Sequence, residues 1–495
     1  MFDEISEGAE RNANCRRSVV EKSLLDDQEV LGNQSFIGLL QAMTELAKRA
    51  IPAFFGTVFK HLIDISNIFF AGKIASFSVD QEIYNASDII AGVGLGILCY
   101  NVFIFSVSWG LSITIDTLTS QAFGSQKYHL CGYYLNRYRV VSTVLFLFQC
   151  ILLLNIGDIL ILIGQAEIPC RVCQIFIKYQ LIGLFCSVQF EGLRRYLIAQ
   201  GVYNMIVYIQ CMCFFLHIGM ISTICYSFGL EVESLSYINL LTNIISLVLL
   251  TLFCMKTSQI PREGWHYELG SFEGLAQFIS LAIPSTMMRC MEYWVSEIIM
   301  IFTGWCGAKD QAAAIIIFNV FLAMYRLISG ISMATSNLVG NCLGNNDAKN
   351  AKQYALASLC VAFVPIILCI NFLFFCRYQI MSFSDDQEVI EKGVSLMIFF
   401  ILICPFDFIQ GSLSGVFTGM GYQKYGSMIN ILSYFLFLIP LAYVLGFVYG
   451  YGTTGIFLAW VLGFLVCSIL VTATVFLTDW DHLTKKIQER LTTTI

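Results

Sequence analysis

Apolar and polar positions follow one another along this chain in long blocks rather than in short periods. Twelve blocks are mainly apolar over about 20 residues or more, the length that an α-helix needs to cross a bilayer. They cover residues 51–72, 88–112, 138–165, 174–198, 203–228, 236–255, 275–304, 311–334, 354–377, 393–417, 427–449 and 455–477. Because their number is even, both ends of the chain are expected on the same side of a membrane.

The longest polar interruption within this pattern runs over residues 256–272, between the sixth and seventh blocks. It predicts an all-α membrane protein whose twelve transmembrane helices form two lobes of six. The expected organisation is an N-terminal tail (1–45), an N-lobe (46–257), an interlobe loop (258–272), a C-lobe (273–478) and a C-terminal tail (479–495).

Composition removes most other classes of protein. The chain is 57% hydrophobic and 13% charged, whereas soluble domains are about 25% charged. No basic stripe favours nucleic acid as a partner. The 19 cysteines are scattered through the apolar blocks, and the one CxxC, Cys170–Cys173, has no second pair to complete a metal site. Walker A, HExxH and GxSxG motifs are absent, so we expect neither an enzyme nor a cofactor.

Lysine and arginine give the orientation, because cytoplasmic loops are enriched in them. With the N-terminus inside, the inner segments hold 19 of these residues and the outer segments hold 6. Both tails are therefore predicted to be cytoplasmic. The Asn-Ala-Ser sequence at Asn85 then lies in the first outer loop, where the topology permits glycosylation.

The two halves resemble each other in sequence. GLSITIDTLTSQAFG (110–124) aligns with GISMATSNLVGNCLG (330–344) at an offset of 220, and AQG (199–201) aligns with GMG (419–421) at the same offset. Two six-helix repeats of equal orientation imply a pseudo-two-fold axis along the membrane normal. Transporters use such repeats to form a central site whose access alternates between the two sides.

Charged residues within the apolar blocks are the candidates for function, because a charge at the bilayer centre costs about 2.5–3.5 kcal/mol on insertion scales. The seventh block holds Arg289, Glu292 and Glu297. Glu292 could form a structural pair with Arg289 one turn away. Alternatively it could exchange a proton, because a partly dry cavity favours the neutral carboxyl form, or bind a cation with help from the aromatic Tyr293 and Trp294.

Other blocks contribute further candidates. Asp407 follows Pro405 in the tenth block, which predicts a broken or kinked helix at a cavity. Asn319 in the eighth block could hydrogen-bond an acid or join two helices. In the first block Lys60 and Asp64 are four residues apart and could pair with each other or contribute to a site.

Two further sets lie near the predicted inner ends of the spans. Gln121 is aligned with Asn341 in the repeats and is a weaker site candidate. Asp116 and Glu191, the latter followed by Arg194 and Arg195, are expected at the membrane interface.

Five motifs in one order resemble the multidrug and toxic compound extrusion (MATE) family of eukaryotic transporters. They are TLTSQAFG (117–124), CMEYWVSE (290–297), SNLVGNCLG (336–344), SGVFTGMGYQK (414–424) and DWD (479–481). The resemblance covers roughly residues 46–490. It implies a V-shaped transporter of two six-helix lobes that exchanges organic substrates for H⁺ or Na⁺ by alternating access.

The same resemblance assigns roles to residues. It maps the family's seventh-span acids onto Glu292 and Glu297, its eighth-span polar position onto Asn319 and its tenth-span acid onto Asp407. Tyr293, Trp294 and Tyr325 are the expected aromatic residues of the substrate cavity, and they favour flat or cationic compounds. Asn337 and Thr418 depart from the family pattern, which has arginine at both positions.

The resulting hypothesis is a monomeric secondary antiporter of a plasma, vacuolar or lysosomal membrane. It exports small organic compounds in exchange for H⁺ or Na⁺. The alternatives are a lipid or lipid-linked flippase with the same two lobes and, from other classes, an intramembrane enzyme or a channel. The sequence identifies neither the substrate nor the coupling ion.

Overall fold

Long helices make up nearly all of the chain that the computed structural model describes, which is residues 37–77, 86–227, 231–265, 273–382, 384 and 386–493. The N-half contains α2 (Leu39–Phe77), α3 (Ala86–Tyr100), the π-helix η1 (Asn101–Phe105), α4 (Ser106–Gly124), α5 (Tyr128–Leu153), α6 (Ile156–Leu162), α7 (Glu167–Ala199), α8 (Asn204–Ser227), α9 (Val232–Lys256) and the 3₁₀ turn η2 (Arg262–Gly264). The C-half contains α10 (Leu275–Cys306), α11 (Ala308–Gly344), α12 (Ala348–Met381), α13 (Gln387–Met420), α14 (Gln423–Asn430), η4 (Ile431–Leu438), α15 (Ile439–Tyr443), η5 (Val444–Val448), α16 (Gly452–Leu477) and α17 (Trp480–Thr493).

These elements form the twelve predicted spans, with α3–η1–α4 and α14–η4–α15–η5 each acting as one. Ten of the described spans are long and apolar enough to cross a membrane. The other two are α2, with 39 residues, and α10, with 32, which carry charges at mid-helix. These are the first helices of the two halves, so each half opens with a span that carries charges at mid-helix.

The third predicted span is wrong at its end. It was expected to reach residue 165, but α5 ends at Leu153 and the short helix α6 follows. Gly164 then turns the chain with a φ of +95°, a conformation that glycine adopts without steric strain. Asn85 and residues 266–272 of the interlobe loop lie outside the described residues.

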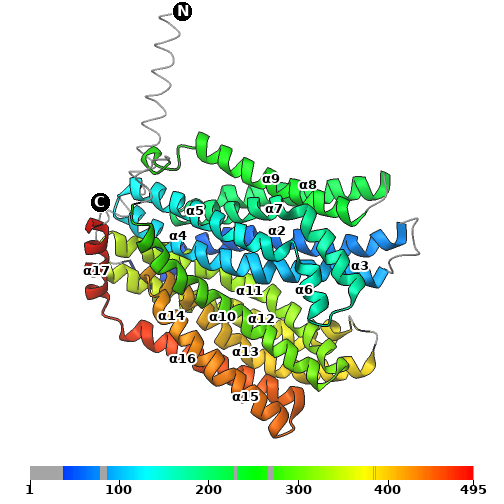
Figure 1. Ribbon diagram of the computed structural model, residues 1–495. Coiled ribbons are helices and arrows are strands. Elements are labelled where there is room, and N and C mark those ends of the chain that lie inside the picture. The colour runs from blue at the N-terminus through cyan, green and yellow to red at the C-terminus, as the bar shows by residue number, and fades with distance from the viewer. Residues whose placement is uncertain are drawn as a thin grey trace, which may run out of the picture.

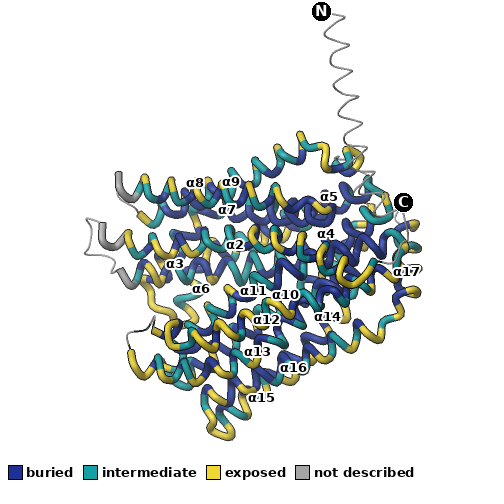
Figure 2. Tube along the Cα trace, turned by 180° about the vertical axis from the view of Figure 1, so that it is seen from behind, coloured by how far each residue is buried: buried dark blue, intermediate teal, exposed yellow. Residues whose placement is uncertain are grey.

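The two halves form two helix bundles that lie side by side (Figure 1). They meet where α2 and α4 pack against α10 and α11, and α2 also packs against α12. Buried residues line the inside of each bundle and continue across this meeting surface near α17 (Figure 2). We call the end of the molecule that holds α17 the closed end.

The repeat seen in the sequence is present in the backbone. Gln126 and Asn346 have φ values of 60° and 59°, and each lies two residues before the helix that follows its repeat segment. Gly201 and Gly421, in the second aligned pair, both have positive φ. All these pairs are separated by 220 residues, so the turns of the two halves are equivalent.

Contacts across the interface obey the same symmetry. A Cβ on Gly124 would overlap the backbone of Asn341, and a Cβ on Gly344 would overlap the backbone of Gln121. Residues related by a two-fold axis exchange contacts in this reciprocal way. The halves are therefore related by a pseudo-two-fold axis that passes through the closed end.

Candidate transport site

Glu292 lies in the C-half and is held by three side chains. The Arg289 guanidinium donates to one carboxylate oxygen at 2.7 Å. The Gln410 amide donates to the other oxygen at 2.8 Å, and the Asn430 amide donates to the same oxygen at 3.2 Å. Helices α10, α13 and α14 thus meet on this carboxylate. The predicted pair with Arg289 is therefore present. The contacts fit both predicted roles of Glu292, a structural ion pair and a group that binds a proton or a cation.

Asp407 is the second deep acid of the C-half, and it has no such partners. It is 4% exposed. Its carboxylate makes no hydrogen bond or ion pair with any described residue, although the charges of Glu292 and Arg289 act on it. Helix α13 continues through Pro405, so of the two predicted alternatives the helix is not broken there, and the kink stays a prediction. A buried carboxylate without compensation is unstable in its charged form, which favours uptake of a proton or a cation.

The structure separates several of the other predicted residues from these acids. Asn319 is exposed, and its amide donates to the carbonyl of Ile315 in its own helix at 2.9 Å. Trp294 is 43% exposed and lines none of the cavities described below. Glu297 is half-buried beside Tyr293, one turn away on α10. The C-half candidates therefore do not form one cluster.

Tyr325 lines a cavity of about 390 Å³ between the halves, together with Trp109 and Arg289. The Arg289 guanidinium lies 4.5 Å from the ring centre of Trp109 and 4.7 Å from that of Tyr325. The Arg326 guanidinium lies 5.7 Å from the ring centre of Trp109. The cation–π contacts of these two rings are thus made with the protein's own arginines.

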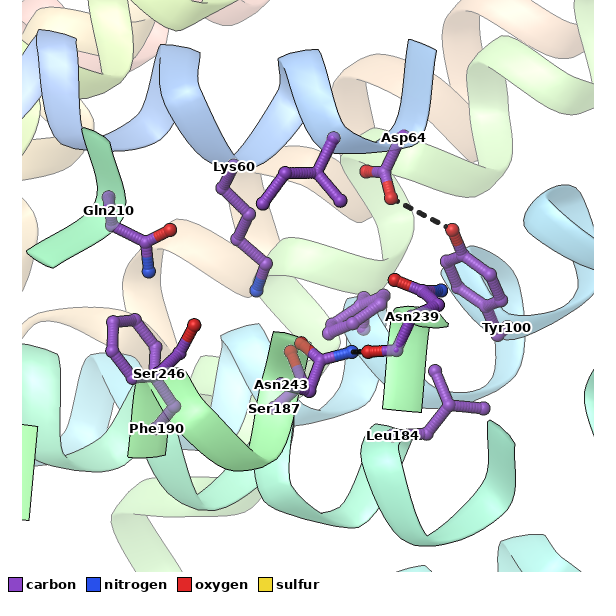
Figure 3. Close-up of a pocket in the computed structure, with 12 residues that line it drawn as sticks. Lys60, Asp64, Tyr100, Leu184, Ser187, Phe190, Gln210, Asn239, Asn243 and Ser246 are labelled. Atoms are coloured by element: carbon purple, nitrogen blue, oxygen red, sulfur yellow. Dashed lines mark hydrogen bonds between the residues drawn. The ribbon is translucent and has the colours of Figure 1, made fainter. Parts of the chain in front are cut away.

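Lys60 and Asp64 lie on α2 at a pocket of about 440 Å³ in the N-half (Figure 3). They do not pair with each other. Asp64 accepts a hydrogen bond from the Tyr100 hydroxyl at 2.9 Å. The Lys60 ammonium lies 4.4 Å from the ring centre of Phe105 and has no hydrogen bond or ion pair with a described residue. In Figure 3 its side chain extends from α2 toward polar residues on the opposite wall.

A neighbouring cavity of about 600 Å³ shares Lys60 and Asp64 and extends to Arg326 of the C-half. The π-helical segment η1 contributes Asn101 and Phe105 to its wall. Such π-turns commonly accompany functional sites in membrane helices. We call this the central cavity, because residues of both halves line it.

A buried ion-pair network lies beside the central cavity. Glu191 accepts hydrogen bonds from Arg194 at 2.6 Å and from Arg195 at 3.0 Å, and Arg195 also pairs with Asp116. All four residues are at most 6% exposed. They therefore lie inside the bundle rather than on its surface, and their place at the membrane interface stays a prediction. Two acids and two arginines compensate one another, so the network is neutral as a unit.

Gln121 lies at the closed end, away from the cavities. Its amide donates to the carbonyl of Gly419 in the C-half at 2.7 Å, and its carbonyl oxygen accepts a hydrogen bond from Arg490 of α17. Burial lowers the pKa of the Arg490 guanidinium from its ordinary value. Gln121 thus joins the two halves and α17 and lines none of the cavities.

Sequence reasoning missed four residues that define the sites. Gln410 and Asn430 hold Glu292, while Arg326 and Trp109 line the cavities between the halves. Arg326 carried a usable signal, because it is a charge inside the eighth predicted span. The amides and the indole carried none, since such residues are common in helix contacts.

Comparisons with known proteins agree with this architecture. The sequence profile of the MatE family matches residues 52–223 and 284–444. Protein DETOXIFICATION 36 of Arabidopsis thaliana is 26% identical over 478 residues, covering 95% of this chain and 92% of that protein. Multidrug and toxin extrusion protein 1 of Xenopus tropicalis is 28% identical over 466 residues, covering 91% and 77%.

The fold has been seen in solved structures. The crystal structure of the eukaryotic MATE transporter AtDTX14 superposes with a TM-score of 0.85 at 24% identity, covering 92% of this chain and 100% of the other. An outward-facing multidrug resistance MATE family transporter gives a TM-score of 0.73 at 15% identity, covering 93% and 98%.

The fold is that of a multi-pass membrane protein of two six-helix lobes. The profile covers more than half of the sequence, and the chain belongs to the MatE family of multidrug and toxic compound extrusion proteins. It is accordingly a transporter and not an enzyme.

Proposed function

We propose that this chain is an antiporter that exports organic compounds in exchange for protons, with Asp407 as the coupling group. The observation that carries the proposal is a carboxylate in mid-span that is 4% exposed and has no hydrogen-bond or ion-pair partner among the described residues. A charge in that position is costly, so the group gains stability when it binds a cation.

Glu292 has a different role in this proposal. Three donors satisfy its carboxylate, so it fixes the geometry around Arg289. Gln410, one turn from Asp407 on α13, is one of those donors. A change in the charge of Asp407 is thereby transmitted along α13 to the contact between α10 and α14.

Protons fit this site better than Na⁺. Sodium requires several oxygen ligands. Gln410 and Asn430, however, turn their amide nitrogens rather than their oxygens toward the Glu292 carboxylate. The Asn430 oxygen instead accepts from the Cys467 thiol at 3.7 Å. A proton needs only one carboxylate oxygen, and Asp407 supplies it.

The coupling cycle follows from this charge. Protonation of Asp407 from the outer side removes its charge and favours the state from which substrate leaves outward. The neutral lobes then rock to the inward-open state, where Asp407 releases the proton and a new substrate binds. A substrate that binds the two protonation states with tenfold different affinity provides about 1.4 kcal/mol of coupling.

We assign the closed end to the cytoplasm, since 19 of the 25 loop and tail lysines and arginines fall on that side in the proposed topology. The central cavity then belongs to an outward-facing state. One buried apolar cluster spans both halves, while a second is confined to N-half residues such as Ala71, Ile97 and Val172. This distribution supports lobes that are joined at the closed end and separable at the other. The host membrane, plasma or vacuolar and lysosomal, stays open.

A lipid flippase is the rival with the same architecture. An apolar groove with about 1420 Å³ of space lies on α8 and α9 and includes Phe215 and Tyr237. It shares no lining residue with the cavities between or within the lobes. A flippase needs a path from the lipid to the central cavity, so this groove favours the antiporter over the flippase.

Transport by purified protein in liposomes tests the proposal. Uptake of radiolabelled tetraethylammonium and of p-aminohippurate is measured under an imposed pH gradient, an imposed Na⁺ gradient and no gradient. We expect uptake of at least one compound to follow the pH gradient and to fall to the gradient-free level in Asp407→Asn. Gradient-driven uptake that persists in this variant would disprove the role of Asp407. Uptake that follows only the Na⁺ gradient would show that the coupling ion is sodium and not the proton.

A further inference from the structure

We infer that the central cavity binds the carboxylate of an organic anion between Lys60 of the N-lobe and Arg326 of the C-lobe. This inference rests on the proposed transport function and names its substrate class. It reverses the preference for cations that the aromatic residues of the sequence suggest.

The first argument is the charge of the cavity. Lys60 and Arg326 both line it, and neither forms an ion pair with a described acid. Glu191 and Arg194 also line the cavity and pair with each other, so together they add no net charge to it. Asp64 is the one remaining acid, which leaves the cavity with an excess of positive charge. Cations in a low-dielectric interior favour an anionic partner.

Unused hydrogen-bond donors provide the second argument. Gln210 is 3% exposed, lines both the central cavity and the adjoining pocket, and makes no side-chain hydrogen bond with a described residue. The Arg326 Nε is also buried without a partner. Buried polar groups are nearly always hydrogen-bonded, so unused donors on residues that line one cavity favour an acceptor bound there.

His61 adds a donor to the same wall. The Arg326 Nη2 lies 3.4 Å from the His61 Nδ1. A guanidinium only donates, so Nδ1 must accept and the proton of the neutral ring lies on Nε2. The carboxylate-binding set is therefore Lys60, Arg326, His61 and Gln210.

The rest of the cavity suits the body of an organic molecule. Phe105 and Trp109 line it and offer aromatic surface to an apolar group. The Trp109 ring already faces arginine, which reduces its use by a cationic substrate. An aromatic or apolar acid satisfies both the rings and the positive charge.

The placement of the two cations also explains how such an anion would be released. Lys60 belongs to α2 and Arg326 to α11, which lie in different lobes. An anion held by both bridges the lobes, and rocking of the lobes separates its two partners. Binding and release are thereby tied to the conformational change.

Ligand-induced thermal stabilisation of the full-length protein in detergent tests the site without any ion gradient. The probes are p-aminohippurate and salicylate, with tetraethylammonium and sodium chloride at matched concentrations. We expect the two carboxylates to raise the Tm of the wild type. Lys60→Gln and Arg326→Gln should each weaken this binding about tenfold or more, because each removes a charge-assisted contact. Asp64→Asn should strengthen it.

Control variants keep the result interpretable. Lys73→Gln removes an exposed lysine from the same helix and should bind like the wild type. Lys60→Arg and Arg326→Lys retain the charges and should retain most of the binding, which guards against variants that merely misfold. Asp407→Asn should bind the probes while losing coupling, so failure of the proton proposal remains distinguishable.

Three outcomes would overturn the inference. Stabilisation by neither carboxylate would exclude an organic-anion site. Stabilisation by tetraethylammonium alone would restore the cation preference. An equal shift with sodium chloride would reduce the site to one for inorganic anions.

Discussion

The interface between the lobes differs between its closed end and its middle. At the closed end glycine backbones touch across the axis, and Thr117, Gln121 and Gln423 form hydrogen bonds within and between the lobes. In the middle the same helices enclose cavities lined by arginines, Lys60 and acids. The closed end is closely packed and made mainly by backbone and uncharged side chains, whereas the middle is hollow and charged.

This difference assigns two tasks to one interface. In the proposed cycle the closed end needs close complementarity, because it must exclude water while the other side is open. The middle needs charged side chains that lack an ion-pair partner, because these gain the most stability when an ion or substrate binds. The stability of the closed end and the charges of the middle can therefore be varied separately.

The largest effect is expected in the charged middle, at the pair of Glu292 and Arg289. Glu292→Gln leaves the Arg289 cation without its carboxylate, and breaking a buried pair costs about 3–5 kcal/mol. The Tm in detergent should fall clearly. The double variant Arg289→Met/Glu292→Gln should recover much of the loss, because no unpaired charge remains. Equal Tm losses in the single and double variants would show that the interaction between Arg289 and Glu292 contributes nothing to stability.

The second-largest effect is expected at the closed end. A Cβ at Gly344 would overlap the backbone of Gln121, so Gly344→Ala should force the lobes apart there. Overpacking of this kind costs about 1–3 kcal/mol. We expect loss of transport and faster thiol labelling of Cys342, which is 7% exposed at this end, read by peptide mass spectrometry.

Gly94→Ala is the matched control for that experiment. Gly94 lies in a helix of the N-half, and its Cβ would meet no atom within 4 Å. It should transport normally and leave Cys342 protected. Unchanged labelling of Cys342 in Gly344→Ala would mean that the closed end tolerates extra volume and is not a rigid gate.

The sequence predicted the fold better than the contacts of the site residues. The closed end and the middle of the interface show why. The motifs that signalled repeats and family, around 117–124 and 336–344, form the closed end. Backbone contact there restricts the residue type to glycine and small polar residues, which leaves a pattern. Apolar length likewise predicts spans, because the bilayer thickness is fixed.

The site lacks a comparable pattern. Lys60 and Asp64 are four residues apart and look like a pair, yet they face Phe105 and Tyr100. Gln410 reaches Glu292 from a helix more than a hundred residues away. Spacing along one helix reports only neighbours on that helix, and the partners here come from others. The lobe boundaries and the roles of the site residues stay predictions.

A smaller effect is expected for α17, which covers the closed end from outside the bundle. The Arg490 guanidinium donates to Gln121, and the Gln488 amide donates to the carbonyl of Gly344 at 2.7 Å. Arg490→Ala should weaken the closed end by about 1 kcal/mol, the usual value of one hydrogen bond. Hydrogen exchange should increase around residues 117–124, while Lys486→Ala, an exposed change on the same helix, should not alter it. Exchange that is equal in both variants would remove α17 from the gate.

The smallest effect is expected at Asn319, where resemblance and structure disagree. The family pattern maps a functional polar residue onto this position, but here the side chain is exposed and its amide donates to the carbonyl of Ile315. An exposed side chain bonded to its own helix contributes little, and most such substitutions change stability by no more than about 0.5 kcal/mol. Asn319→Ala should therefore leave both the Tm and pH-driven uptake within about twofold of the wild type. If uptake instead fell as far as in Asp407→Asn, Asn319 would have to approach an acid in another state of the cycle. The charged middle of the interface would then extend along α11 beyond the cavities seen in this state.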